Sequence, residues 1–453
     1  MTRPDAVVRS SRVLVGDDDV APASIVISAG RIAGVVDWNA KHAAGTTLHD
    51  FGEAVVMPGL VDTHVHINEP GRTEWEGFAS ATRAAAAGGI TTLLDMPLNS
   101  IPATTSVAAL ERKRGAAGGQ CWVNVGLLGG VVPGNAADII PLWDAGVFGF
   151  KSFLSPSGVD EFPHVTLADL DAALPIIASL GAVLMVHAES PDLLQPVHGD
   201  RHRYANYLAS RPDAAETEAV RHLIALSERH GARIHVVHLS SGGSLPLLDA
   251  ARRRGIPVTC ETCPHYLSFS AEEIPDGATL YKCAPPIRDA GTRAALWEAI
   301  GRGGIDGIVS DHSPCPPEMK ESDSGDFDAA WGGIASLQLG LPAVWSGANA
   351  AASLLSIGRI AALMSTNPAK LAGLSHRKGR IATGFDADLV AWTPEHAFAV
   401  DPARLFHRHH ATPYSGRTLH GVVEATLVGG DVAYLRGALG ATPHGQLMNA
   451  RDP

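Results

Sequence analysis

Short apolar runs alternate with amphipathic segments between residues 55 and 313. Most segments between the runs place apolar residues at the spacing of one helix face. The eight runs are VVMPGLVDTHVH, GGITTLLDMP, QCWVNVGLLGG, VFGFKSF, GAVLMVHAE, RIHVVHLSS, IPVTCETCPHY and IDGIVSDHSP. Strands buried on both faces are apolar nearly throughout, so eight strand–helix units in series predict a (β/α)8 TIM-like barrel of the α/β class. An open doubly wound sheet is the alternative, but no G-x-G-x-x-G follows the first run.

Five segments between these runs predict helices by their apolar spacing. They read WEGFASATRAAAA, TTSVAALERKR, LADLDAALPIIASLG, DAAETEAVRHLIALSERHG and GTRAALWEAIGRG. Glycine is typical just after a helix, and Gly181 and Gly231 stand at the ends of the third and fourth segments.

Both ends of the chain have a different pattern, with short alternating or β-branched runs and turn residues. Near the C-terminus, VEATLVGGDVAYLRG predicts a hairpin that turns at Gly429-Gly430. We expect residues 1–56 and 378–453 to form one small β-sandwich beside a barrel of residues 57–377. A helix over Ile357–Leu374 would connect the two parts.

Composition and charge exclude several classes of protein. The net charge is −12 and no basic run is present, which argues against a nucleic-acid partner. No stretch reaches the roughly 18 apolar residues of a membrane span, and the charged N-terminus lacks the apolar region of a signal peptide. Five scattered cysteines, an odd number, favour free thiols in a reducing cytoplasm.

Side chains that bind metal ions gather where the runs end. Barrel enzymes carry their reacting groups at the C-terminal ends of the strands. The first run ends with His-x-His, and residues two apart share one face of a strand. The candidates from five of the eight runs are His64, His66, Lys151, His187, His238 and Asp311.

Strand alternation selects between neighbouring candidates. His235 and His238 are three residues apart, so they cannot both face the barrel interior, and His238 lies nearer the end of its run. Asp311 and His312 must also diverge, and we expect Asp311 to face the site.

Taken singly, each candidate has an ordinary explanation. A lone histidine is usually a hydrogen-bonded structural residue, a lone lysine snorkels to the surface, and an aspartate before Ser-Pro caps a turn. CETC lacks the two further ligands of a closed zinc site and is interpreted as packing of the seventh strand. These explanations do not account for the occurrence of all six candidates together in five of the eight runs.

Neutral imidazole and carboxylate ligands suit zinc, with manganese, cobalt or iron as alternatives. A zinc ion lowers the pKa of its water from 15.7 to about 7, and two ions roughly 3.5–4 Å apart can share the hydroxide. Protonated Lys151 could not bind a metal ion, because an ammonium group has no free lone pair.

Seven stretches resemble the cyclic amidohydrolases of the amidohydrolase superfamily, and within them the allantoinases. They are MPGLVDTHVHINEPGR, GGITTLLDMPLN, GFKSF, VTCETCPHY, KCAPPIRD, SDHSPCPPEMK and WGGIASLQ. The resemblance covers nearly the full length and implies a homo-oligomer, commonly a tetramer. It implies two divalent ions, one held by His64, His66 and Asp311 and the other by His187 and His238. Lys151, carboxylated by carbon dioxide, would bridge the ions.

The implied reaction opens the hydantoin ring of allantoin, a small ureide, to give allantoate. A metal-bridging hydroxide would attack, with Asp311 as general base and then as acid toward the leaving nitrogen. Backbone groups near Cys283, Ala284 and Gly333 are candidate substrate contacts, and so is Asn68.

Relatives with other substrates remain alternatives. Dihydroorotases have an arginine where this chain has Asn68, and hydantoinases and dihydropyrimidinases have a tyrosine that KSFLSPSG lacks. Both differences favour allantoin. Ala284 replaces a serine that is common in the family, so the resemblance defines the substrate less closely than the type of reaction. A non-catalytic scaffold is a further alternative, although all six ligand-type residues are present.

Overall fold

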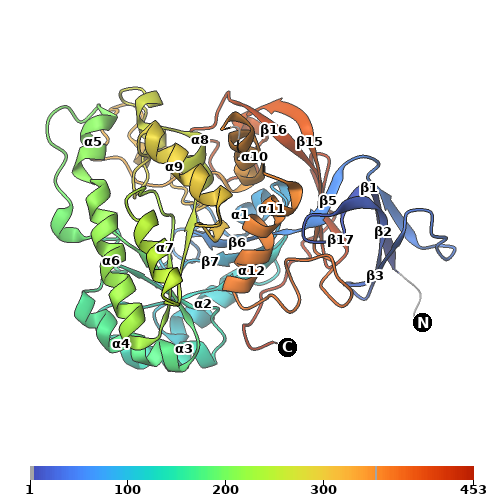
Figure 1. Cartoon of the computed structure of the whole chain (residues 1–453), viewed down its shortest axis with the longest axis horizontal. Helices are drawn as coiled ribbons and strands as arrows, with labels where there is room; N and C mark the ends of the chain where they lie inside the picture. The colour runs from blue at the N-terminus through green and yellow to red at the C-terminus, as the bar shows by residue number, and fades with distance from the viewer. Residues whose placement is uncertain (1–4, 352, 354, 453) are drawn as a thin grey trace.

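The protein consists of a barrel surrounded by helices and a β-sheet assembled from both chain ends (Figure 1). The computed structural model describes residues 5–351, 353 and 355–452. The N-terminal strands lie beside the C-terminal strands, because β5 (Val55–Pro58) pairs with β15 (Leu389–Ala399).

The barrel strands form two parallel sheets that join edge to edge. At one junction Val65 bridges to His312, and at the other the N–H of Leu128 donates to the carbonyl of Asp95 at 3.1 Å. The third predicted run is divided into β8 and β9, so nine short strands occupy eight barrel positions. The strands are β6 (Leu60–Val65), β7 (Ile90–Asp95), β8 (Asn124–Leu127), β9 (Gly129–Gly130), β10 (Phe150–Phe153), β11 (Val183–His187), β12 (Arg233–Val236), β13 (Val258–Thr262) and β14 (Gly307–Ile308).

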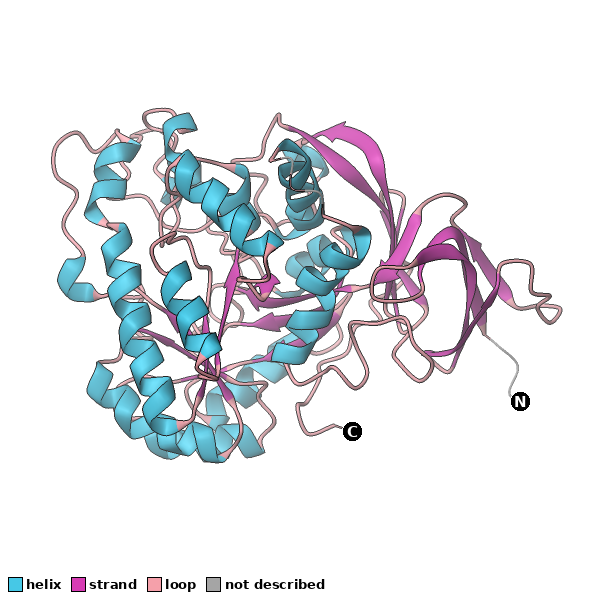
Figure 2. Cartoon of the chain, viewed as in Figure 1, coloured by secondary structure: helices cyan, strands magenta, loops and turns pink. Residues whose placement is uncertain are grey.

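Helices cover the outside of the barrel (Figure 2). All five helices predicted from apolar spacing are confirmed, as α1, α2, α4, α6 and α9, and other helices lie between and after them. The α-helices of the described residues are α1 (Phe78–Ala87), α2 (Val107–Ala117), α3 (Ile139–Asp144), α4 (Leu167–Ser179), α5 (Tyr204–Ser210), α6 (Asp213–His230), α7 (Leu245–Arg253), α8 (Pro264–Ser268), α9 (Ala290–Gly301), α10 (Gly340–Ala350), α11 (Ile357–Ala361) and α12 (Asn367–Leu371).

Local sequence sets where these helices begin and end. Thr166 and Asp169 form a reciprocal capping box at the start of α4. Gly231 ends α6 in the left-handed conformation, as its position predicted. The single helix expected over Ile357–Leu374 is interrupted by a π-helical turn at Ala362–Thr366. Pro368 follows directly, and its missing N–H and bulky ring are a physical reason for the wider turn.

The second sheet has nine strands, in the order β18-β17-β16-β15-β5-β1-β2-β3, with β4 paired to β1. The predicted hairpin is confirmed, because Val428 pairs with Asp431 across Gly429-Gly430, both at positive φ. The remaining strands are β1 (Ala6–Leu14), β2 (Val20–Ser28), β3 (Arg31–Asp37), β4 (Thr47–Asp50), β16 (Thr418–Val428), β17 (Asp431–Leu435) and β18 (Ala438–Leu439).

The domain boundaries 1–56, 57–377 and 378–453 stay predictions. The end of the chain turns back to the barrel, where the N–H of Met448 donates to the carbonyl of Val125 at 2.8 Å. All five cysteines are buried free thiols. Over the described residues, we find no helix with the length and apolar character needed to cross a membrane.

Candidate active site

The predicted metal-binding side chains come together at the C-terminal end of the barrel. His64 is on β6, Lys151 on β10 and His187 at the end of β11, while His238 and Asp311 follow β12 and β14. Parallel strands end at the same mouth of a barrel, so residues far apart in sequence meet there.

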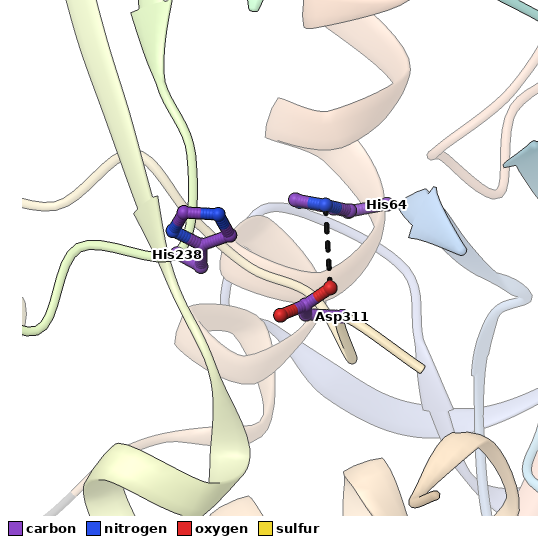
Figure 3. A group of neighbouring side chains, drawn as sticks. All are labelled: His64, His238 and Asp311. Carbon is purple, nitrogen blue, oxygen red and sulfur yellow. Dashed lines mark ion pairs between the residues drawn. The ribbon is translucent and has the colours of Figure 1, made fainter. Parts of the chain in front are cut away.

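His64 lies at the centre of the cluster. Its Nε2 is 3.3 Å from Oδ1 of Asp311, and Nε2 of His66 is 3.5 Å from the same oxygen. The His64 and His238 ring centroids are 5.3 Å apart (Figure 3). Ligand atoms of His64, His238 and Asp311 all lie within 4.8 Å of one another, close enough for one metal ion.

His187 and His238 form the other part of the cluster. Nδ1 of His187 is 3.0 Å from Nε2 of His238. The other ring nitrogen of His187, Nε2, donates to Glu189 at 2.7 Å. Arg211 in turn donates to Glu189. Burial opposes ionisation of Glu189, but Arg211 and His187 overcome it and hold the carboxyl pKa below its ordinary value. The Glu189 carboxylate therefore directs Nδ1 of His187, with its lone pair, toward His238.

Burial lowers the pKa values of His64, His187 and His238, so these rings are neutral near pH 7. Neutral imidazole is the form that binds metal ions.

Lys151 is fully buried, and its Nζ has no hydrogen-bond partner within the described part of the chain. Burial lowers the pKa of this amine to about 7, although Asp311 and Glu261 oppose the shift. The lowered pKa makes the neutral amine of Lys151 accessible near pH 7. A buried amine without a partner is destabilising by itself and is the kind of group that a covalent modification or a nearby ion would satisfy.

Two of the predicted metal-binding residues have strained backbones. His238 has φ of 38° and Asp311 has φ of 44°, values that non-glycine residues seldom adopt. Asn68, two residues after His66, and Asn99, whose Nδ2 is 3.3 Å from Nδ1 of His66, also have positive φ. Such strain is concentrated where function requires a side chain to point in an unfavourable direction.

A cavity of about 550 Å³ opens above the cluster and is lined by His64, His66, His187, His238 and Asp311. Its volume suits a small ring compound. Two of the candidate substrate-contact residues line this cavity, Ala284 and Gly333. The other two, Asn68 and Cys283, are buried outside the lining residues, and their contact with substrate stays a prediction.

One expectation from strand alternation is wrong. Both His235 and His238 face the barrel interior, because β12 ends at Val236 and alternation no longer governs His238. Nε2 of His235 is 3.0 Å from Oε2 of Glu261, and the other carboxylate oxygen is 2.8 Å from Nδ1 of His64. By contrast, the divergence of Asp311 and His312 is confirmed, since His312 contacts Glu76 at 3.1 Å.

Sequence reasoning missed the carboxylates that orient the histidines. Glu261 lies within CETC, interpreted only as packing, and Glu189 follows His187 by two residues. Because residues two apart in an extended segment share one face, the spacing of Glu189 from the candidate ligand His187 could have identified it. His265 was missed as well. Both of its ring nitrogens are buried and find no hydrogen-bond partner among the residues that the structure describes, and together with Cys263 it lies near Asp311.

Known proteins are similar to this chain over most or all of its length. Residues 55–433 match the amidohydrolase family. An allantoinase from Streptomyces avermitilis is 48% identical over the full length of both chains. An allantoinase from Arabidopsis thaliana is 44% identical and covers 97% of this chain and 90% of its own. The chain belongs to the amidohydrolase family, in its allantoinase branch.

A solved structure of this family extends the similarity to the fold. The L-hydantoinase (dihydropyrimidinase) of Arthrobacter aurescens is 32% identical, with a TM-score of 0.93 over 98% of this chain and 100% of that one. As an amidohydrolase, the protein is an enzyme that hydrolyses cyclic amides. Amidohydrolases of this kind depend on metal ions, and the His64–His238–Asp311 group is the candidate position for one.

Proposed function

We propose that this enzyme hydrolyses allantoin to allantoate. The supporting observation is the convergence of four histidines and Asp311 around the unpartnered amine of Lys151, beneath a cavity of about 550 Å³. Water adds to the ring amide carbonyl, the carbon–nitrogen bond breaks, and the nitrogen gains a proton. The allantoinases similar to this chain over its full length favour allantoin among cyclic amides.

The residues fit a pair of divalent ions, for which we propose zinc. His64, His66 and Asp311 would hold one ion, and His187 and His238 the other. His238 lies within reach of both positions, because one of its ring nitrogens is near ligand atoms of His64 and Asp311, and its Nε2 is 3.0 Å from Nδ1 of His187. Bound ions would acidify a water molecule and polarise the amide carbonyl. Lys151 would bridge them as a carbamate, formed when its neutral amine attacks carbon dioxide and loses a proton. The pKa of about 7 for Lys151 supports this step, because only the unprotonated amine is nucleophilic.

We assign proton transfer to Asp311. Its carboxylate faces the cavity and lies beside both His64 and His66, so it can take a proton from water on the cavity side. The protonated carboxyl can then deliver this proton to the leaving ring nitrogen. A departing amide nitrogen is strongly basic, so this second transfer is as necessary as the first.

The assignment is tested by a product assay with allantoin, hydantoin, dihydrouracil and dihydroorotate side by side, before and after chelation. We expect ring opening of allantoin to exceed that of the others, to stop on chelation and to return with added zinc. Activity that survives complete metal removal would refute a metal-dependent reaction. Dihydrouracil as the best substrate would make the enzyme a dihydropyrimidinase, the activity after which the L-hydantoinase with the same fold is also named.

Glu261→Gln should weaken metal binding by about 10- to 100-fold, the usual effect of removing a partner of a metal-binding histidine. Glu261 accepts from Nδ1 of His64, which leaves Nε2 with its lone pair facing Asp311. A glutamine amide can present its NH2 group to His64 instead and favour the wrong tautomer. Competition with a chelator of known affinity measures the change.

Glu216→Gln is the matched control. Glu216 is also buried, but it pairs with Arg288 and Ser240 outside the candidate site. Its loss should lower the melting temperature and leave the metal affinity unchanged. A folded Glu261→Gln enzyme with wild-type metal affinity would contradict the role given to Glu261.

We propose a cytoplasmic location and a homotetramer for this enzyme. Five buried free thiols support a reducing compartment, since none of them forms a disulfide. Sedimentation of the purified enzyme decides the number of subunits.

A further inference from the structure

One wall of the cavity is lined by residues of two segments, 282–284 and 328–333. Its lining residues are Lys282, Ala284, Asp328, Ala329, Ala330, Trp331, Gly332 and Gly333. Five of them are alanine or glycine, whose side chains carry no hydrogen-bonding group. A ureide ring is rich in hydrogen-bond donors and acceptors, so at these five positions only the peptide groups can recognise it.

Lys320 fixes these peptide groups from behind. The residue is only 5% exposed, and its Nζ donates to the carbonyls of Lys282 at 3.4 Å, of Trp331 at 3.0 Å and of Gly333. The N–H of Gly333 donates to the same Lys282 carbonyl at 2.9 Å. One ammonium group thus ties the two segments together at three points.

Lys282 reinforces the same wall. Its Nζ donates to the carbonyl of Asp328 at 3.0 Å and to that of Ala330. Among the described residues, no carboxylate forms an ion pair with Lys282 or Lys320. Lys282 is half-buried, and its Nζ also lies 5.2 Å from the centre of the Tyr207 ring. Lys320 is buried and bonds to backbone carbonyls. A buried charge satisfied by carbonyl dipoles is costly to maintain, and a wall held for stability alone would not need one.

Gly333 shows how closely the wall is packed. Its φ is 156°, and a Cβ there would lie 2.2 Å from the carbonyl oxygen of Ser313. The segment therefore cannot shift toward Ser313, while Lys320 prevents it from moving away from Lys282. Ser313 also lines the cavity, beside Asp311.

We propose that Lys320, assisted by Lys282, is a positioning residue for substrate recognition. Its ammonium holds segment 331–333 against segment 282–284, so that the backbone groups of the wall meet the ureide ring at fixed positions. This inference deepens the proposed function and rests on it. It predicts that loss of Lys320 affects substrate binding and leaves the metal ions and the chemical step in place.

The test is Lys320→Met, which keeps the length of the side chain and removes the charge. We expect KM for allantoin to rise roughly 10- to 100-fold, the loss associated with charged hydrogen bonds, while kcat and metal content stay close to wild type. Calorimetric titration of allantoin into Asp311→Asn, with and without Lys320→Met and at equal metal content, measures binding while turnover is slow. Hydrogen exchange should become faster at the backbone amides of 328–333.

Lys378→Met is the matched control, because Lys378 is also a buried lysine but pairs with Asp386 and Asp388 near the nine-stranded sheet. It should lower stability without changing KM or the exchange of 328–333. Unchanged KM and exchange in Lys320→Met overturn the proposal, as does a loss that Lys378→Met reproduces. If Lys320→Met does not fold, Lys282→Met decides by the same measurements. A wild-type enzyme that opens no cyclic amide overturns the proposed function. The hydrogen-exchange measurement then tests by itself whether Lys320 holds segment 331–333 against segment 282–284.

Discussion

Lys151→Ala is expected to lose its bound metal and its turnover together. The truncation removes the group proposed to contact both ions, so neither set of histidines retains its full number of ligands. Without metal-activated water, the rate should fall by about 10³-fold or more, since that activation lowers the water pKa from 15.7 to about 7. Metal analysis and product assays on the same preparation measure both effects. Formate or acetate in the buffer should restore part of each, because a small carboxylate fits the space left by the side chain.

Ser152→Ala is the control for this substitution. Ser152 is the next residue on β10, and its side chain points to the opposite face of the strand. The variant should keep both metal and activity. A Lys151→Ala enzyme with full turnover would show that the lysine does not bridge the ions.

Asp311→Asn should slow the chemical step by roughly 10²- to 10⁴-fold, the contribution of a general acid–base group. Asparagine nearly preserves the shape of the side chain, so we expect the melting temperature to change little. The amide cannot take a proton from water or return one to the leaving nitrogen. Single-turnover rates and thermal melts on one sample separate the two effects.

Asp306→Asn tests whether any lost carboxylate near β14 has this effect. Asp306 comes directly before β14, whereas Asp311 follows it. Asp306 pairs with Arg252 at 2.6 Å and accepts from the N–H of Cys260. Its substitution should lower stability and leave the single-turnover rate unchanged. The assignment of Asp311 would fail if Asp311→Asn kept a wild-type rate.

The fold does not decide the substrate. This chain and the L-hydantoinase of Arthrobacter aurescens share one fold, with a TM-score of 0.93, so the fold alone cannot distinguish their substrates. We therefore assign specificity to the residues that line the cavity. Ala284 lies in that wall without a hydroxyl group, which gives the backbone around it a larger share in recognition.

The sequence by itself determined the barrel, the shared sheet of both chain ends and the predicted metal-binding set. These follow from local rules: buried parallel strands must be apolar, and reacting groups must follow them. The His-x-His spacing of His64 and His66 survives folding although β6 ends at Val65, because the N–H of His66 still donates to the carbonyl of His312 at 2.8 Å and continues the pairing of the strand. The same rule was wrong for His235 and His238, because the strand ends between them.

Only the tertiary structure decided which groups orient the site. Glu261 reaches His64 across the barrel from a strand nearly 200 residues later, and no local period links them. The three acceptors of Lys320 are backbone carbonyls, which every residue possesses, so no sequence pattern distinguishes them. Periodicity determines which face of a strand a side chain occupies, whereas its partner across the interior depends on how the strands close into a barrel.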